Sequence, residues 1–378
     1  MRKVRLPGTH RAVRPETTWT WVEPRLRHFG ITRVADITRL DNIGIPVFLA
    51  VRPASETLAV SQGKGASPLL ARLSAVMESI ELWHAERPML PTFVAKPTGL
   101  GLPYAMTDLN LRARDSWVLQ LELPWVQARS LVDDRHIPVP LDLVRLSYSG
   151  KHFWRSRLFE SSSTGLASGN TPTEACLHGL YEAVERDALA AHPSRSDAGR
   201  LRIAPETIRD DHLRSLMNRL TDADVEFDIS CIPNRFGIPT FAAFVWSPLF
   251  PIVCAGSGAH MDPVVALSRA LTEAVQSRLT EISATRDDIP STQDTWRDAS
   301  TDPGFPTTPG ASIEEVLRGH RADFDDMEEE LAEVTRRVMD VTGHAPMAVP
   351  LSDPSEPFSV VRVICPALAY AEGRTLSA

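Results

Sequence analysis

Short apolar runs bounded by glycine or proline alternate irregularly along this chain with longer segments of helical period. Ser67 and Pro68 suit the N-cap and first position of a helix, which should run to about residue 84. Further helices are expected near 171–191, 206–220, 263–284 and 312–341. Strands are expected at 43–53, 56–65, 125–131, 136–146, 224–231, 239–246, 251–260 and 358–368. Residues 1–30 show no sustained period and suggest an extended arm, so the pattern predicts a mixed α/β (α+β) fold.

Three of these helices carry a narrow polar stripe although most of their other positions are apolar. The stripes are Ser74, Glu78 and Glu81 in the first, Glu174, Glu182 and Glu185 in the second, and Arg269, Glu273 and Gln276 in the third. At about 100° per residue, each stripe covers roughly 80° or less of its helix. Like charges so close together repel, and burial makes this more costly, so something positive should face the glutamates.

Each of the three helices also follows a glycine-bearing segment: GKG at 63–65, STGLASGN at 163–170 and GSGAH at 256–260. Glycines let a ligand approach the backbone closely, and helix N-termini offer N–H groups to anions. Mg²⁺ prefers oxygen ligands and often joins carboxylates to phosphates, while Lys64 and Arg186 would neutralise phosphate oxygens, with Asn170 beside them. The three segments together predict a site for a nucleotide with bound magnesium.

Taken singly, several of these features favour a structural explanation. Glu182 and Arg186 stand in the favourable i, i+4 order for a helix-surface salt bridge. His178 and His260 are more often packed or hydrogen-bonded histidines than ligands, and GKG lacks the spacing of a P-loop. The acidic run at 323–333 is typical of a solvated helix face. Only the convergence of the three stripes favours a site.

Composition narrows the class of protein. The formal net charge is −8, which argues against a general nucleic-acid-binding surface. The four cysteines form no CxxC pair and suggest reduced core thiols rather than disulfides or a zinc site. No secretory signal and no run of 18 apolar residues is present, so a cytoplasmic enzyme or binding protein without a membrane span is expected.

These segments resemble the YcaO family, ATP-dependent enzymes that activate peptide backbone amides. The stretch 61–88 resembles its first nucleotide motif, 161–188 its second and 256–288 its third, and 36–53 and 358–368 also read as family segments. The likeness predicts a YcaO-type fold, in which sheets are flanked by helices with a nucleotide site between them, over 35–378 after an N-terminal arm at 1–34. Two positions depart from the pattern: Leu82 and Thr280 stand where the family has arginine.

The resemblance implies roles for individual residues. Four glutamates would hold Mg²⁺: Glu78, Glu81, Glu182 and Glu185. The side chains in contact with ATP would be Lys64, Ser74, Asn170 and Arg186, with Glu174 lining the same pocket. Gln276 with Arg278 or Arg286 would reach the phosphates.

The resemblance also implies a reaction and partners. The substrate would be a ribosomal precursor peptide whose amide oxygen is phosphorylated, and the product an azoline, a thioamide or an amidine. Azoline-forming members often end in a Pro-x-Pro-x-Pro tail, which is not found at 365–378, so thioamidation is slightly favoured. The enzyme would act with a TfuA-type partner or a leader-binding partner, or alone as bottromycin-type members of the family do, and a homodimer is expected. A non-catalytic nucleotide-binding accessory protein and an ATP-dependent ligase remain open as other classes.

Overall fold

The computed structural model describes residues 2–111, 116–146, 158–159, 162–192, 199–285, 302–318, 320 and 324–369. Its strands form four sheets in which every strand pairing described is antiparallel. The first two are the hairpin β1 (Val4–Leu6) and β2 (Thr9–Arg11), and the sheet β3 (Arg33–Asp36), β4 (Val47–Val51) and β5 (Val60–Lys64). A four-stranded sheet has the order β10 (Leu201–Arg202), β11 (Glu226–Cys231), β12 (Thr240–Ser247) and β13 (Phe250–Ala259). The largest has the order β6 (Phe93–Ala95), β7 (Leu123–Ser130), β14 (Met347–Pro350), β15 (Ser359–Ile364) and β9 (Leu166–Gly169), with β8 (His136–Pro140) paired to β7.

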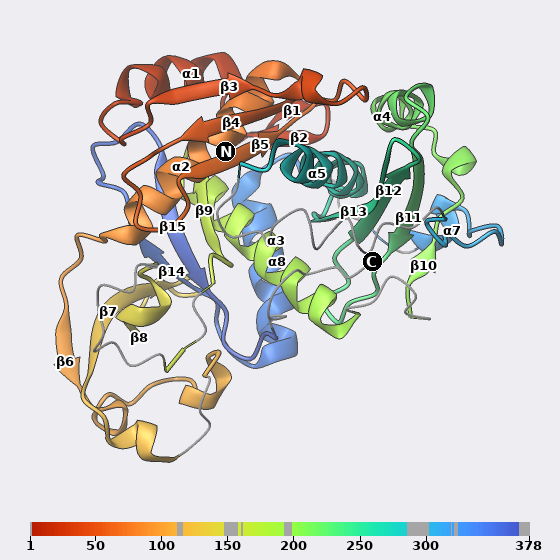
Figure 1. The fold of residues 1–378 in the computed structure, drawn as a ribbon. Helices are drawn as coiled ribbons and strands as arrows, with labels where there is room; N and C mark the ends of the chain where they lie inside the picture. The colour runs from red at the N-terminus through yellow and green to blue at the C-terminus, as the bar shows by residue number, and fades with distance from the viewer. Residues whose placement is uncertain are drawn as a thin grey trace.

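Helices pack between and against these sheets. The α-helices are α1 (Pro15–Val22), α2 (Pro68–Glu86), α3 (Pro172–Ala191), α4 (Asp211–Asp222), α5 (Pro263–Ser283), α7 (Ile313–Val316) and α8 (Met327–Thr342). Short 3₁₀ turns lie at Glu23–Arg25, Thr38–Leu40, Pro97–Gly99, Met106–Asp108, Ser116–Gln120, Leu141–Leu143 and Pro205–Thr207. Figure 1 shows α3 in the middle of the molecule, with the largest sheet on one side and the four-stranded sheet on the other. The mixed α/β fold expected from the sequence is confirmed.

The three striped helices begin in the same way. Each starts with proline after a side chain that accepts a backbone N–H: Ser67 from Leu70 in α2, Thr171 from Glu174 in α3 and Asp262 from Val264 in α5. These caps satisfy part of the first turn, and proline at the first position has no N–H to lose. The N-cap predicted at the first helix is therefore confirmed.

Glycine lets each of these helices lie directly on the strand before it. A Cβ atom on Gly63 of β5 would lie 1.9 Å from the backbone nitrogen of Ala75 in α2. A Cβ atom on Gly169 of β9 would lie 2.4 Å from a backbone nitrogen of α3, and one on Gly256 of β13 would lie 2.2 Å from a backbone nitrogen of α5. At these positions the close approach that glycine permits is that of a helix, whereas the sequence suggested a ligand. The three strand–helix units thereby hold their polar stripes in a fixed position.

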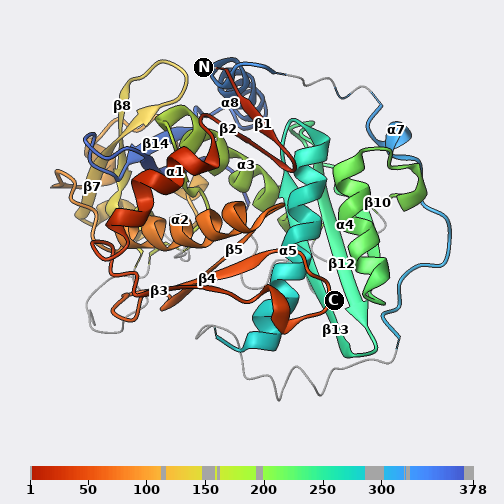
Figure 2. The ribbon, with the colours of Figure 1, turned by 90° about the horizontal axis from the view of Figure 1, so that it is seen from above.

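Two expectations about the elements were wrong. The extended arm expected at the N-terminus contains the hairpin β1–β2 and the helix α1, which starts at Pro15 and packs on α2. Figure 2 shows α1 lying over α2, and β1 running from α8 towards α5. The single helix expected over 312–341 is two helices, α7 and α8, and residues 317, 318 and 324–326 between them are not helical. The division of the chain at residue 34 remains a prediction.

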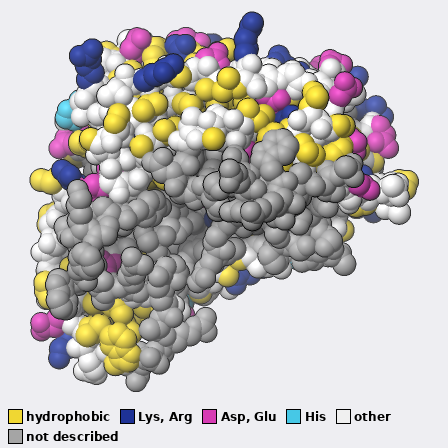
Figure 3. All heavy atoms as spheres, in the orientation of Figure 1, with side chains coloured by type: hydrophobic (Ala, Val, Ile, Leu, Met, Phe, Trp, Pro, Cys, Tyr) yellow, Lys and Arg dark blue, Asp and Glu magenta, His cyan; other side chains and the backbone are white. Residues whose placement is uncertain are grey.

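Other surface and core features bear on the class of protein. All four cysteines are buried and free, as expected for core thiols. Within the described residues, no helix combines the length and apolar character needed to cross a bilayer. On the face drawn in Figure 3, the described acidic and basic side chains lie interspersed.

Candidate active site

Side chains from all three polar stripes line one cavity of about 290 Å³. Its walls come from α2, α3 and α5, the ends of β5 and β9, and the N-terminal segment. The charged and polar lining side chains are Arg11, Thr18, Lys64, Ser74, Glu78, Glu81, Ser168, Asn170, Glu174, His178, Glu182, Glu185, Arg186, Ser257, Arg269 and Glu273. Every residue expected at the site from the first two motifs is therefore brought to a single place.

On the α2 wall, each glutamate is oriented by a neighbouring strand. Glu78 accepts a hydrogen bond from the backbone N–H of Gln62 at 3.2 Å. Glu81 accepts one from the Ser168 hydroxyl at 2.5 Å, which joins α2 to β9. Because one carboxylate oxygen of each residue is engaged in these bonds, the side chains are held in place while still lining the cavity.

On the α3 wall, the other two glutamates are held in a similar way. Glu182 accepts from the backbone N–H of Gly165 at 3.1 Å. Glu185 accepts from the Ser257 hydroxyl at 2.6 Å and from the backbone N–H of Ala259 at 3.1 Å. The segments before α3 and α5 thus supply donors to the carboxylates of α3.

Burial of these carboxyl groups perturbs their protonation. It raises the pKa of Glu81 to about 8, against an opposing hydrogen bond from Ser168 and with further increases from the charges of Glu78 and Glu182. Burial also raises the pKa of Glu182 and of Glu185, and the charges of neighbouring carboxylates raise both pKa values further. Buried carboxyl groups that raise one another's pKa mark a candidate functional site, and a cation bound between them would favour their ionised forms.

Four cationic side chains line the same cavity: Arg11, Lys64, Arg186 and Arg269. Lys64 forms an ion pair with Glu273 of α5. Arg186 lies 3.7 Å from Glu182, so the i, i+4 salt bridge expected from the sequence is formed, and both partners also face the cavity. Burial opposes ionisation of Arg186, but the nearby carboxylates outweigh it and raise its pKa.

The N-terminal segment closes one side of the cavity. The His178 ring donates from Nδ1 to the Ser168 carbonyl at 2.9 Å, so its Nε2 accepts from Arg11 at 2.7 Å. Burial, followed by the charges of Arg11 and Arg269, lowers the pKa of His178 well below its usual value, which keeps the ring neutral. Sequence reasoning missed Arg11, because an isolated arginine in an aperiodic segment carries no signal.

Glu174 differs in role from the other glutamates. It is buried, and it accepts hydrogen bonds from the backbone N–H of Ala12 at 3.0 Å and from the Asn170 side chain at 2.9 Å. The Thr18 hydroxyl donates to the Asn170 side-chain oxygen at 2.6 Å. Glu174 and Asn170 therefore attach the N-terminal segment to α3 as well as lining the cavity.

Of the residues expected from the third motif, neither Gln276 nor Arg278 lines the cavity. Arg278 is 2% exposed and pairs with Asp41 at 2.7 Å. It lies nine residues, about two and a half turns, after Arg269 and therefore on the opposite face of α5. Gln276 shares the face of Arg269 but lies about 10 Å further along α5 and does not line the cavity. Arg286 lies outside the described residues. The stripe of α5 reaches the cavity through Arg269 and Glu273 instead. Their i, i+4 spacing in the sequence already placed these two side chains on one face of the helix.

The glutamates of the cavity suit Mg²⁺ that is bound jointly by protein carboxylates and substrate phosphates. Within the described ranges, no three histidine, cysteine, aspartate or glutamate side chains form a ready-made metal site. Mg²⁺ is commonly held by one or two carboxylates together with substrate phosphates, an arrangement that needs no such cluster. Pairs of glutamates on facing helices, beside four cations suited to phosphate, match this donor set.

A family model described as YcaO cyclodehydratase, ATP- and Mg²⁺-binding, matches residues 62–369. The chain belongs to the YcaO family. The recognition made from the sequence is thus confirmed, together with ATP and Mg²⁺ as the cofactors. Part of the cavity, at Arg11, Pro15 and Thr18, lies before the matched residues.

Two curated bacterial proteins are similar to this chain over most of its length. An uncharacterized protein of Mycobacterium tuberculosis is 37% identical over 96% of this chain and 83% of its own length. A Rhizobium leguminosarum protein, described as uncharacterized and in the tfuA 3′ region, is 37% identical over 95% of this chain and 88% of its own.

Among solved structures, YcaO from Methanopyrus kandleri, bound with AMPPCP and Mg²⁺, has a TM-score of 0.75 at 22% identity and covers 98% of this chain and 95% of its own. A heterocyclase in complex with substrate and cofactor has a TM-score of 0.75 at 20% identity over 97% of this chain, which spans 55% of the heterocyclase's length. At these identities the likeness confirms a YcaO-type fold.

Proposed function

We propose that this YcaO protein uses ATP and Mg²⁺ to phosphorylate a backbone amide oxygen in a ribosomal precursor peptide, and that the product is a thioamide. The observation that carries the proposal is the meeting of α2 and α3 glutamates with lysine and arginine side chains around one cavity. Membership in a family described as an ATP- and Mg²⁺-binding cyclodehydratase supports amide activation.

Different walls of the cavity would bind the metal, the phosphates and the base of the nucleotide. Pairs from α2 (Glu78 and Glu81) and α3 (Glu182 and Glu185) would hold Mg²⁺, which when bound offsets charge on the transferred phosphoryl group. The phosphate oxygens would be met by Lys64, Arg186, Arg269 and Arg11. The polar side chains Ser74 and Asn170 would contact the nucleotide, whose base suits the apolar wall of Pro15, Leu70, Leu73, Met77 and Phe358.

The reaction proceeds in two steps. The amide oxygen attacks the γ-phosphorus of ATP, a new oxygen–phosphorus bond forms and ADP leaves. Sulfide then adds to the activated carbon, and the original amide oxygen departs as part of phosphate. The protein contributes orientation of the two substrates and stabilisation of charge, rather than a covalent nucleophile.

The choice of sulfide as nucleophile rests on a single relative. The Rhizobium protein is described by its place in a tfuA region, and a TfuA-type partner is the one expected for thioamidation. The proposal therefore includes a TfuA-like partner. A homodimer of this chain is also proposed, on the family resemblance alone. An azoline formed from a cysteine, serine or threonine side chain is the runner-up, and a macroamidine formed by an N-terminal amine follows it.

Mass spectrometry of a candidate precursor separates the thioamide from the two dehydrated products. The purified chain is incubated with the peptide, ATP, Mg²⁺ and sulfide, with and without a TfuA-type protein. Thioamidation exchanges one oxygen for sulfur, whereas azoline and macroamidine formation each remove one water. A heavy-oxygen label in the amide should end in inorganic phosphate, which separates amide activation from ligation of free carboxylates.

Peptide-dependent release of ADP distinguishes an enzyme from an accessory protein that only binds nucleotide. The wild-type chain should release ADP only when peptide is present, and Glu182→Gln should not. A mixture that gives neither product mass nor ADP with any precursor and partner would refute the enzymatic proposal.

A further inference from the structure

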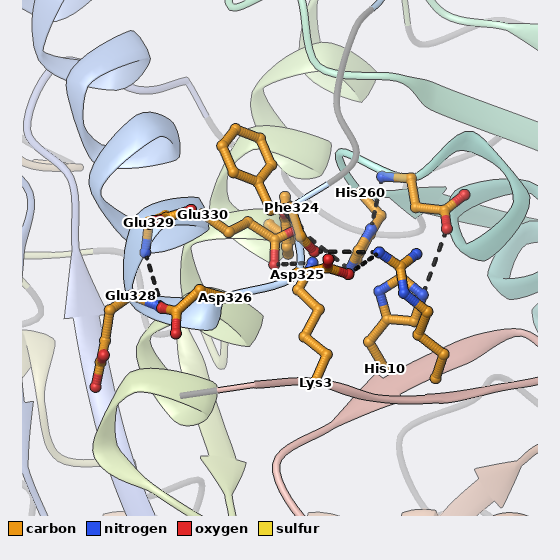
Figure 4. Close-up of polar contacts among 12 residues, drawn as sticks. Lys3, His10, His260, Phe324, Asp325, Asp326, Glu328, Glu329 and Glu330 are labelled. Atoms are coloured by element: carbon orange, nitrogen blue, oxygen red, sulfur yellow. Dashed lines mark hydrogen bonds and ion pairs between the residues drawn. The ribbon is translucent and has the colours of Figure 1, made fainter.

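A buried ion pair lies beside the cavity, outside the set of side chains that line it. Lys3 Nζ lies 2.8 Å from Glu330 Oε2, and both side chains are 2% exposed. The second oxygen of Glu330 accepts from the Tyr181 hydroxyl of α3 at 2.7 Å. Figure 4 shows Lys3 of the N-terminal segment pointing at Glu330 of α8, with His260 and His10 beside them.

Such a pair contributes little net stability, because desolvation offsets most of the attraction between the charges. The role of the Lys3–Glu330 pair is better explained by the two segments that it holds together. The Lys3 backbone also donates to the Asp325 carbonyl at 2.9 Å, so both the main chain and the side chain of this residue are attached to the start of α8. One residue later the hairpin begins, and in its register Val4 lies opposite Arg11.

A short stretch of the hairpin therefore connects Lys3, at α8, to Arg11, at the cavity. Arg11, the last residue of β2, extends into the cavity, while Lys3, next to its strand partner Val4, is fixed to α8 on the other side. Paired residues on neighbouring strands are only about 5 Å apart, so a shift at Lys3 passes directly to the Arg11 backbone.

Two further contacts hold the same hairpin. At its tip, Gly8 has φ of +68°, and a Cβ there would lie 2.2 Å from the Ser268 hydroxyl oxygen, so the turn lies closely on α5. His10 Nε2 lies 3.4 Å from Asp262, the residue that caps α5. The Lys3–Glu330 pair ties this hairpin to α8, the helix that packs on the cavity wall α3, and its buried charges distinguish it from the exposed pair that Arg5 of β1 forms with Asp325 at 2.9 Å.

We infer that Lys3 and Glu330 are positioning residues, which hold the hairpin β1–β2 so that Arg11 reaches the nucleotide phosphates. The inference rests on the proposed function, since it assumes that the cavity binds a nucleotide. Arg11 contacts the ligand, and Lys3 acts only through Arg11.

A double-mutant cycle tests this directly. The variants are Lys3→Met, Arg11→Met and the two together, and the readouts are the dissociation constant of Mg²⁺ with a non-hydrolysable ATP analogue, by calorimetry, and the thermal midpoint. Lys3→Met should weaken binding about tenfold. In the Arg11→Met background the same change should weaken binding no further, because the side chain that it positions is gone.

Controls separate positioning from loss of stability. Arg52→Met breaks another buried ion pair, with Glu86 at 2.6 Å, whose residues do not line the cavity. It should lower the thermal midpoint but leave the nucleotide affinity of the folded protein unchanged. Lys3→Arg keeps the charge and should restore most of the affinity. If Lys3→Met does not fold, Lys3→Met with Glu330→Gln leaves no unpaired buried charge and enters the cycle in its place.

The outcomes distinguish the inference from the function beneath it. A wild-type chain that binds no nucleotide analogue would overturn both. A wild-type chain that binds, together with a Lys3→Met chain that binds equally well, would overturn the positioning role alone. Equal losses from Lys3→Met in the presence and absence of the Arg11 side chain would also overturn it, since the two residues would then act independently.

Discussion

Binding of Mg²⁺ with nucleotide should release a proton from Glu81. The pKa of this carboxyl is raised to about 8, first by burial and then by neighbouring carboxylates. At pH 7 a group with that pKa is about nine-tenths protonated, and at pH 9 about one-tenth. Because a metal ligand must be ionised, binding at pH 7 should release about 0.9 proton from this residue.

The sign of the pH dependence follows from the same shift. Affinity for Mg²⁺ with a non-hydrolysable ATP analogue should rise with pH by up to about tenfold per unit below pH 8, then level off. In the metal-free protein the folded state binds more protons at Glu81 than the unfolded state, so the free energy of unfolding should fall as pH rises from about 4.5, the model-peptide value, to about 8.

Calorimetry in buffers of different ionisation enthalpy measures the released protons. A titration of nucleotide with Mg²⁺ alone corrects for the phosphate's own proton, and work at pH 7.5 and above keeps that correction small because the phosphate pKa is about 6. Proton uptake on binding, or an affinity that is constant from pH 7 to pH 9, would refute the electrostatic account of the cavity.

Three substitutions and one control substitution test other parts of the structure. Glu182→Gln should abolish ATP turnover at an unchanged thermal midpoint, and retained turnover would remove its proposed role in holding metal. Gly63→Ala should prevent folding or lower stability by several kcal/mol, since its Cβ would lie 1.9 Å from a backbone nitrogen of α2. Gly99→Ala, with nothing within 4 Å, is its matched control and should leave the thermal midpoint unchanged. Arg52→Met should lose about 3–5 kcal/mol in urea unfolding but keep nucleotide affinity; weakened affinity in the folded protein would show that its pair with Glu86 also shapes the cavity.

The parts of the site that could be predicted from sequence are those set by local rules. Cap and proline pairs, such as Ser67 with Pro68, fixed where the helices begin, and helical spacing then fixed which side chains share a face. Because three neighbouring helices carry such a face, their convergence could be anticipated before any coordinates. The family resemblance added the identity of the ligand, which spacing alone did not supply.

The parts that could not be predicted depend on tertiary contacts. Arg11 reaches the cavity only because the hairpin before α1 folds back against α5 and α8, and no period in residues 2–14 indicates that path. Arg278 was chosen by analogy, although on an ideal helix it lies about 180° from Arg269. A helical-wheel comparison within α5 would have favoured Arg269, because the cavity faces the stripe and not the opposite side.

The charges around the cavity also decide in what form a nucleotide can enter. Six glutamates line it (Glu78, Glu81, Glu174, Glu182, Glu185 and Glu273), against four cationic side chains, Arg11, Lys64, Arg186 and Arg269. A bare triphosphate would bring further negative charge against these carboxyl groups and oppose their ionisation, and burial strengthens the repulsion. The nucleotide analogue should therefore bind with Mg²⁺ and lose most of its affinity when EDTA replaces the metal. Equal affinity with and without EDTA would mean that the lysine and arginine side chains suffice, and that the glutamates of α2 and α3 serve only to orient them.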